Sequence, residues 1–291
     1  MEIKASMVKE LREKTGAGMM DAKKALVETN GDMDKAIELL RQKGMASADK
    51  KMGRIAAEGT IAAVIEGNKG ALVEVNCETD FVAKNDDFKE FANMMAKAVL
   101  ELNPATVDEM LTMDCPVCKK PIEDVIKEHI AKIGEKITVR RFARYDAGNC
   151  VNSYIHNGKI GVMLEVKAYS CDETVTKDIC LHIASNAPEF VSREEIPASV
   201  IEEEKRIEMG KEDLANKPEQ IREKIVEGRV NKLMAQRCLL EQPFVKNPDM
   251  TIAQLTDGKC QVVKFERFVL GEGLEKRQEN FAEEVMSQIK G

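Results

Sequence analysis

The chain has 291 residues, 44 of them Lys or Arg and 51 Asp or Glu, which gives a formal net charge of −7. This acidic balance makes nucleic acid an unsuitable main partner, because phosphate binding needs a basic surface. Residues 1–54 are slightly basic on their own, which indicates either a docking surface or an ordinary solvated face. With 4% aromatic residues, no Trp and 16 Met, the composition favours helix-rich modules packed with aliphatic side chains and Met.

The sequence predicts a cytoplasmic protein. Its first residues lack the apolar segment of a secretory signal. No stretch approaches the run of about 18 apolar residues that a membrane-spanning helix needs, so no membrane partner is expected. The 8 cysteines are therefore expected to be reduced thiols.

Residues 1–54 are predicted to form a three-helix domain that docks a partner. The first helix contains Val8 and Leu11, and the second covers residues 19–28 and stops at the Asn30-Gly31 turn. Asp32 can cap the third helix, which we expect to end at Gly44. Its apolar stripe has helical spacing and consists of Met33, Ala36, Ile37 and Leu40. Residues 50–54 are the predicted hinge into the next part.

From residue 58 the pattern changes to alternation, which predicts strands over residues 60–65 and 70–75. A helix follows, capped by Asn85 or Asp86, and its buried face consists of Phe88, Phe91, Ala92, Met95 and Val99. Residues 161–166 echo residues 70–75, and each copy leads into a helix, over residues 178–186 in the second copy. The repetition predicts a two-lobed core, although short strands can also look alike by chance.

The last third of the chain contains a different element. Residues 197–240 are highly charged and are interrupted at Pro218, which predicts an antiparallel helical hairpin with a narrow apolar seam. The predicted seam consists of Val226, Val230, Leu233 and Leu240. Residues 261–270 return to a strand pattern that should complete the sheet of the second lobe, and residues 275–289 are a predicted charged helix. The fold class is α+β, with a docking domain over residues 1–54, a first lobe over 55–148, a second lobe over 149–291 and a protruding hairpin at about 197–240.

Nothing in the sequence supports a catalytic site, a metal site or a bound cofactor, so an enzyme is not predicted. The three His residues are isolated from one another, and no phosphate-binding P-loop motif is present. The Cys115–Cys118 pair is the strongest rival signal, because a C-x-x-C at a helix start can form a reactive thiol. It lacks the preceding strand of a thioredoxin-like site, and as a zinc site it has two ligands, with only His129 and Cys150 as further candidates. A redox pair, a zinc site and an incidental loop pair all remain open.

Residues 77–85 are the segment that we expect to carry function, because they join a strand to a capped helix. Asp80 and Phe81 stand side by side here, and an acidic group next to a large aromatic suits a wedge better than a core. Phe81 also lies seven residues before Phe88. It could therefore simply extend the buried face of the following helix, and the spacing does not decide between the two interpretations.

The 79–84 string resembles the signature of the elongation factor Ts family. Matches to that family's motifs run in order along nearly the whole chain: residues 15–21, 23–26, 131–135, 140–141, 156, 188–190, 227–229, 242–245 and 271–273. The resemblance implies a ubiquitin-associated-like three-helix domain, a two-lobed core with internal repetition and a protruding hairpin. It also implies guanine-nucleotide exchange on elongation factor Tu, in its GDP-bound and nucleotide-free forms.

The resemblance further implies roles for particular residues. Asp80 and Phe81, within the Thr79–Val82 string, would insert between helices of the partner's GTPase domain near its magnesium. The residues beside that contact would be Ile133, Gly134 and His156, while Lys23 would hold the GTPase domain and Val245 a more distant domain. Two features depart from the family pattern: Lys246 follows Val245 where Met is expected, and the Cys115–Cys118 loop has no counterpart.

Three classes of function are thus distinguished: an exchange factor, a binding module that grips a GTPase without affecting its nucleotide, and a thiol or zinc protein. One or two copies per complex are both compatible with the sequence, so homodimerisation within a larger complex is an open alternative.

Overall fold

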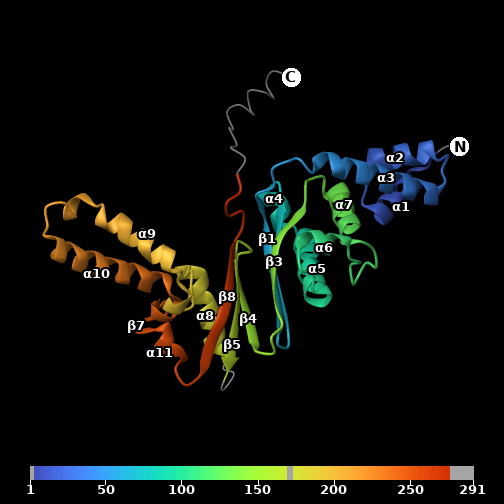
Figure 1. Cartoon of the computed structure of the whole chain (residues 1–291). Coiled ribbons are helices and arrows are strands. Elements are labelled where there is room, and N and C mark those ends of the chain that lie inside the picture. Colours follow the sequence, from blue (N-terminus) through green and yellow to red (C-terminus); the bar gives the residue numbers. More distant parts are fainter. Residues whose placement is uncertain (1–2, 169–172, 276–291) are drawn as a thin grey trace. The chain divides into compact units, whose positions relative to one another are not determined.

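The computed structural model describes residues 3–168 and 173–275. The chain has the mixed α+β architecture that the sequence predicts (Figure 1). It divides into two compact units: Ala63–Leu72 with Arg144–Phe268 form what we call the second unit, and the rest of the described chain forms the first unit. The closing helix predicted over residues 275–289 falls outside the described residues, apart from its first position.

Three helices open the first unit: α1 (Ala5–Thr15), α2 (Met19–Glu28) and α3 (Met33–Lys51). Their shared core consists of Val8, Leu11, Ala22, Ala25, Leu26 and Ala36. Asp32 caps α3 as predicted, because its carboxylate accepts a hydrogen bond from the backbone N–H of Lys35 at 3.1 Å.

Helix α3 continues past Gly44 to Lys51, so the prediction that Gly44 ends it is wrong. The reason is tertiary packing. A Cβ added at Gly44 would lie 2.8 Å from the Cβ of Ala131 on α7 (Ile122–Ile133). Gly44 therefore permits the close approach of two helices instead of breaking one. The hinge is correspondingly shorter than predicted, because Lys50 also belongs to α3.

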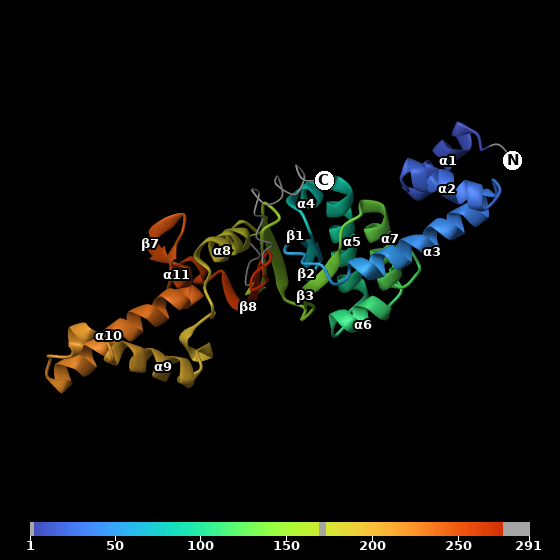
Figure 2. The ribbon, with the colours of Figure 1, turned by 90° about the horizontal axis from the view of Figure 1, so that it is seen from above.

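A three-stranded sheet has the order β1-β2-β3, with β1 over Glu58–Glu66, β2 over Lys69–Cys77 and β3 over Thr138–Tyr145. The first two strands match the prediction. Beside the sheet lie α5 (Asp86–Leu102), α6 (Val107–Thr112) and α7 (Figures 1 and 2). Asn85 caps α5, and all five residues of its predicted apolar face are buried.

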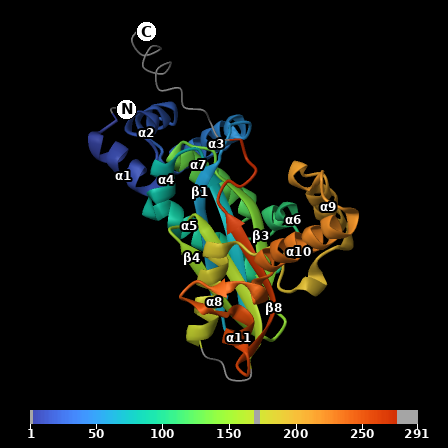
Figure 3. The same cartoon turned by 90° about the vertical axis from the view of Figure 1, so that its left-hand side faces the viewer.

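The second unit contains a sheet of order β4-β5-β8, with β4 over Cys150–His156, β5 over Ile160–Ala168 and β8 over Cys260–Val269. Strands β4 and β5 form an antiparallel hairpin that pairs Cys150 with Val166 and His156 with Ile160. Helix α8 (Glu173–Asn186) packs on these two strands (Figure 3). The shared apolar core includes Val162, Leu164, Ile179 and Ile183.

The predicted helical pair is present as α9 (Ala198–Met209) and α10 (Glu219–Arg237), which pack on each other (Figure 3). Val226 and Val230 are buried in their seam, as predicted. Leu240 was assigned to the same seam, but it packs against the core of the second sheet. The short remaining elements are η1 (Arg193–Glu195), η2 (Glu212–Leu214), η3 (Leu239–Glu241), β6 (Pro243–Phe244), β7 (Asn247–Thr251) and α11 (Ile252–Thr256).

Each of the two similar strands buries a glutamate at the same motif position. Glu74 on β2 accepts hydrogen bonds from Arg140 at 3.0 Å, Arg141 at 2.6 Å and the backbone N–H of Gly271 at 2.9 Å. Burial alone would raise the pKa of Glu74, but these donors outweigh it and hold the pKa below its ordinary value. Glu165 on β5 is paired with Lys264 at 3.4 Å. A buried carboxylate needs such partners.

Candidate functional site

The segment between β2 and α5 presents a large aromatic side chain to solvent. It forms a short helix, α4 (Asp80–Lys84), on which Phe81 is 82% exposed. The alternative in which Phe81 extends the buried face of α5 is therefore wrong. A side chain of this size gains substantially from removal from water, so an exposed Phe at a fixed position is suited to entering a pocket in another molecule.

The neighbours of Phe81 hold α4 in its helical form. The Thr79 hydroxyl accepts a hydrogen bond from the backbone N–H of Val82 at 3.4 Å and so caps the helix. Asp80 lies in the first turn, where a negative charge complements the helix dipole, and its carboxylate is 2.6 Å from the ammonium of Lys84. Both Asp80 and Val82 are half-buried. The acidic and aromatic side chains are thus presented together from one short turn.

The loop before α4 is tied to the loop after α7 by two carboxylates. The Glu135 carboxylate accepts hydrogen bonds from the backbone N–H groups of Glu78 and Thr79 at 3.1 and 2.9 Å, and from the Thr79 hydroxyl at 2.6 Å. In the opposite direction, the Glu78 carboxylate accepts from the backbone N–H of Lys136 at 2.7 Å. We call these two reciprocally bonded glutamates the carboxylate clasp.

The clasp brings two predicted contact residues beside the α4 loop. Ile133 is the last residue of α7, and Gly134 follows as its C-cap with φ of +88°. This conformation favours glycine, which explains why glycine ends the helix here. Ile133 is half-buried and Gly134 is exposed, immediately before Glu135 of the clasp.

Lys23 lies on α2 within an exposed, partly apolar helix face. Met20, Lys23 and Val27 are spaced three and four residues apart and share this face. Met19 is 57% exposed, Met20 62% and Val27 56%. In the sequence, the Met19–Met20 pair at the start of this helix is the signal for an apolar contact surface beside Lys23.

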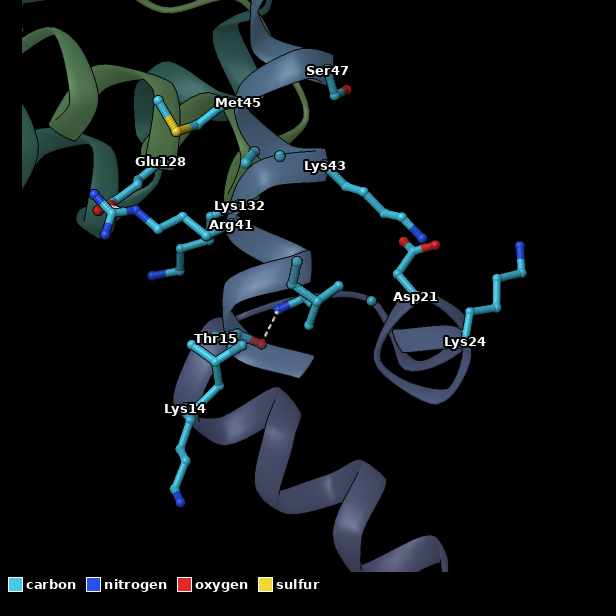
Figure 4. Close-up of a pocket in the computed structure, with 16 residues that line it drawn as sticks. Lys14, Thr15, Asp21, Lys24, Arg41, Lys43, Met45, Ser47, Glu128 and Lys132 are labelled. Carbon is cyan, nitrogen blue, oxygen red and sulfur yellow. Dashed lines mark hydrogen bonds and ion pairs between the residues drawn. The ribbon is translucent and has the colours of Figure 1, made fainter. Parts of the chain in front are cut away.

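A pocket of about 510 Å³ lies in the first unit between α3, the α1–α2 turn and α7 (Figure 4). Its charged lining includes Lys14, Lys24, Arg41, Lys43, Lys132, Asp21 and Glu128. Four of these five cations are paired with carboxylates: Lys14 with Glu10 at 2.9 Å, Arg41 with Glu128 at 3.4 Å, Lys43 with Glu28 at 2.7 Å and Lys132 with Asp87 at 2.6 Å. Figure 4 shows Lys14 and Lys24 pointing away from the pocket. The pocket is therefore not a concentrated anion site.

The remaining two predicted residues, His156 and Val245, belong to the second unit. His156 is exposed at the end of β4, and its Nδ1 lies 3.0 Å from the Tyr154 hydroxyl. Val245 is 40% exposed, and its backbone N–H donates to Nδ1 of the buried His182 at 3.2 Å. His182 Nε2 lies 2.8 Å from Gln242 Oε1. Since Nδ1 accepts, Nε2 carries the proton, and the ring is neutral in this arrangement.

Lys246, which departs from the expected Met, makes an ion pair within the chain. Its ammonium lies 2.6 Å from the carboxylate of Asp178 on α8. The position after Val245 is therefore committed to an ion pair beside α8, instead of offering an unpaired apolar side chain.

The Cys115–Cys118 segment forms a tight loop ahead of α7. The backbone N–H of Lys119 donates to the Cys115 carbonyl, and that of Cys115 to the Lys120 carbonyl, both at 2.8 Å. Helix α7 begins only at Ile122, so the pair does not sit at a helix start. Burial and the neighbouring Cys115 raise the pKa of Cys118, which disfavours a reactive thiolate. The incidental loop pair is the interpretation that fits these contacts.

His129, a further zinc-ligand candidate from the sequence, contacts neighbouring groups within the first unit. His129 Nδ1 lies 2.8 Å from the Val125 carbonyl, and its ring packs on Phe91. Over residues 3–168 and 173–275, no group of three or more His, Cys, Asp and Glu side chains is placed to hold a metal ion. In the same ranges, none of the helices combines the length and apolar character needed to cross a bilayer.

Comparison with known proteins gives a consistent result. Residues 78–272 match the family model described as "Elongation factor TS". A protein named elongation factor Ts from Alkalilimnicola ehrlichii is 50% identical over 295 residues, covering 100% of both chains. Another of that name, from Thioalkalivibrio sulfidiphilus, is 47% identical over 296 residues, again covering 100% of both chains.

Proposed function

Because the chain belongs to the elongation factor Ts family, we propose that it is a guanine-nucleotide exchange factor for elongation factor Tu. It promotes GDP release during translation elongation and acts by binding, without catalytic chemistry of its own. The family membership supports this role, and the exposed wedge on α4 supplies a physical means for it.

In this proposal Phe81 and Asp80 disturb the magnesium and phosphate-binding region of the GTPase. Phe81 enters an apolar pocket between helices of the partner, where its burial contributes binding free energy. Asp80 places a negative charge near the magnesium ligands and so disturbs the way in which they are arranged. Thr79 and Val82 support the two side chains from the ends of the same turn.

The other predicted residues extend the contact. Ile133 and Gly134, which the clasp holds beside the α4 loop, contact the GTPase next to the wedge. His156 also contacts the GTPase domain, and Lys23 with the exposed face of α2 binds that domain. Val245 contacts a more distant domain, beside an ion-paired Lys246.

The same family membership is the basis on which we propose the finer architecture. Helices α1 to α3 act as a ubiquitin-associated-like docking domain, the strand–turn–strand–helix units are two copies of a repeat, and α9 and α10 form a protruding hairpin. The domain divisions at residues 54 and 148 also remain predictions.

Exchange requires differential binding. The factor must bind nucleotide-free elongation factor Tu more tightly than the GDP-bound form, since a ligand shifts an equilibrium only by its differential affinity. By reciprocity, bound nucleotide weakens the factor's affinity by the same ratio. Incoming GTP can then displace the factor.

The observation that carries the proposal is the 82% exposure of Phe81 on a helix that its neighbours hold in place. The test is release of fluorescent GDP from purified elongation factor Tu, followed by stopped flow with and without this protein. The proposal predicts faster release in proportion to occupancy of the complex. A protein that binds the GTPase and leaves the release rate unchanged would be a passive binding module, and the proposal would be wrong.

A further inference from the structure

The Glu135 carboxylate is only half-buried, yet it accepts three hydrogen bonds. Its Oε2 accepts from two successive backbone N–H groups, those of Glu78 and Thr79, at 3.1 and 2.9 Å. Its Oε1 accepts from the Thr79 hydroxyl at 2.6 Å. Hydrogen bonds to an ionised carboxylate are stronger than neutral ones. These three fix the residues immediately before Asp80 and Phe81.

Glu78, the other glutamate of the clasp, connects the same loop to the segment that follows α3. The Glu78 carboxylate accepts from the backbone N–H of Lys136 at 2.7 Å and from the guanidinium of Arg54 at 3.2 Å. The Lys136 ammonium donates to the Arg54 carbonyl at 2.9 Å. Arg54 lies just after α3, so the loop before α4 is held from two directions.

We propose that Glu135 is a positioning residue for nucleotide exchange, which holds the α4 loop so that Phe81 is presented in its productive orientation before the partner arrives. This inference rests on the proposed function. A loop that is fixed in its binding geometry avoids an ordering cost on association, and the saved free energy appears in the exchange step.

A carboxylate matches this bonding pattern better than an amide does, because all three partners are donors to it. An amide side chain offers one acceptor oxygen and one donor NH₂ group. In a Glu135→Gln variant, either the two backbone N–H groups or the Thr79 hydroxyl would face that NH₂ group. The hydroxyl can rotate to accept from that NH₂ group, but the two backbone N–H groups then share a neutral amide oxygen, which binds them more weakly than an ionised carboxylate does. The variant keeps the shape of the side chain and weakens the clasp.

The experiment measures fluorescent-GDP release from elongation factor Tu at factor concentrations below saturation, where the rate includes the cost of association, with four proteins: wild type, Glu135→Gln, Phe81→Ala and the double variant. The matched control is Glu90→Gln, because Glu90 is an exposed glutamate on α5 that takes no part in the clasp. We expect Glu135→Gln to slow release about tenfold relative to wild type, the effect of losing one charge-assisted hydrogen bond. Glu90→Gln should match wild type.

The double variant distinguishes positioning from general structural support. If Glu135 acts through Phe81, then adding Glu135→Gln to Phe81→Ala produces no further loss, because coupled residues are non-additive. Equal fold-losses in both backgrounds would overturn the inference. So would a Glu135→Gln variant as fast as Glu90→Gln while wild type and Phe81→Ala differ as proposed. If wild type itself does not accelerate release, the proposed function is wrong and the inference falls with it.

Amide hydrogen exchange on the free protein gives a second readout that needs no partner. The N–H groups of Glu78 and Thr79 should exchange markedly faster in Glu135→Gln than in wild type, because their acceptor is altered. Amides in the middle of α5 should be unchanged, which shows that the fold is retained. Unchanged exchange at Glu78 and Thr79 would overturn the clasp as the positioning device.

Discussion

At the scale of single residues, the central feature is a large aromatic side chain that is not buried in the core of its own chain. Phe81 is 82% exposed, whereas Phe88 and Phe91 on the following helix are buried. Replacement of an exposed side chain away from caps and charge networks usually changes stability little. A substitution of Phe81 should therefore lower exchange activity without lowering the stability of the fold.

The first prediction is that Phe81→Ala retains its thermal unfolding midpoint but loses most exchange activity. Truncating an aromatic hot spot costs about 2 kcal/mol, and about 1.4 kcal/mol corresponds to a factor of ten, so release should slow about thirtyfold. Val117→Ala is the matched control, because Val117 is 64% exposed in the Cys115–Cys118 loop. Equal release rates for the two variants would rule out the wedge.

The sequence predicted that Asp80 and Phe81 lie between a strand and a capped helix, which the structure confirms, yet it left the orientation of Phe81 undecided. Spacing reports which residues share a helix face, and α4 and α5 proved to be separate helices. The role of Glu135 was not predictable, because its partners lie 56 and 57 residues away in the chain. Such contacts are set by tertiary structure, whereas motifs and periodicity describe local structure.

At the scale of elements, Gly44 shows how packing overrides a local rule. Glycine weakens a helix interior by about 1 kcal/mol relative to Ala, which is why it was interpreted as a stop. The helix continues because α3 and α7 approach so closely that a Cβ at Gly44 would lie 2.8 Å from that of Ala131. The remainder of α3, together with α2 and α5, followed the sequence pattern well, since each has an apolar face with helical spacing.

The second prediction is a compensating pair at this helix contact. Gly44→Ala should destabilise the protein by about 1 to 3 kcal/mol, because overpacking outweighs the gain in helix propensity. Moving the methyl group across the contact, with Gly44→Ala and Ala131→Gly together, should restore most of that loss. Denaturant unfolding of the two single variants and the double variant measures the coupling. Additive losses would show that the contact is not steric.

At the scale of the whole molecule, buried histidines make stability depend on pH in the physiological range. Burial lowers the pKa of His182 in the second unit and of His129 in the first below the ordinary value of 6.5. The unfolded chain therefore binds more protons than the folded chain once the pH falls below about that value. Stability is retained above it and decreases as the pH falls.

The third prediction is a loss of stability between about pH 7.5 and about pH 5.5, with a smaller loss in a His182→Gln variant. Protonation of His182 would add a second ring N–H opposite the backbone N–H of Val245, which now donates to that ring. Denaturant midpoints at the two pH values measure the slope, so the comparison holds even if the variant is less stable overall. An unchanged slope would contradict this role for His182.

The central claim for the whole molecule is thermodynamic: the factor distinguishes an empty nucleotide site from an occupied one. Isothermal titration of this protein into nucleotide-free and into GDP-bound elongation factor Tu measures that difference directly. Our account predicts much tighter binding to the nucleotide-free form, with the difference reduced in Phe81→Ala. Equal affinity of the wild-type protein for the two forms would contradict it.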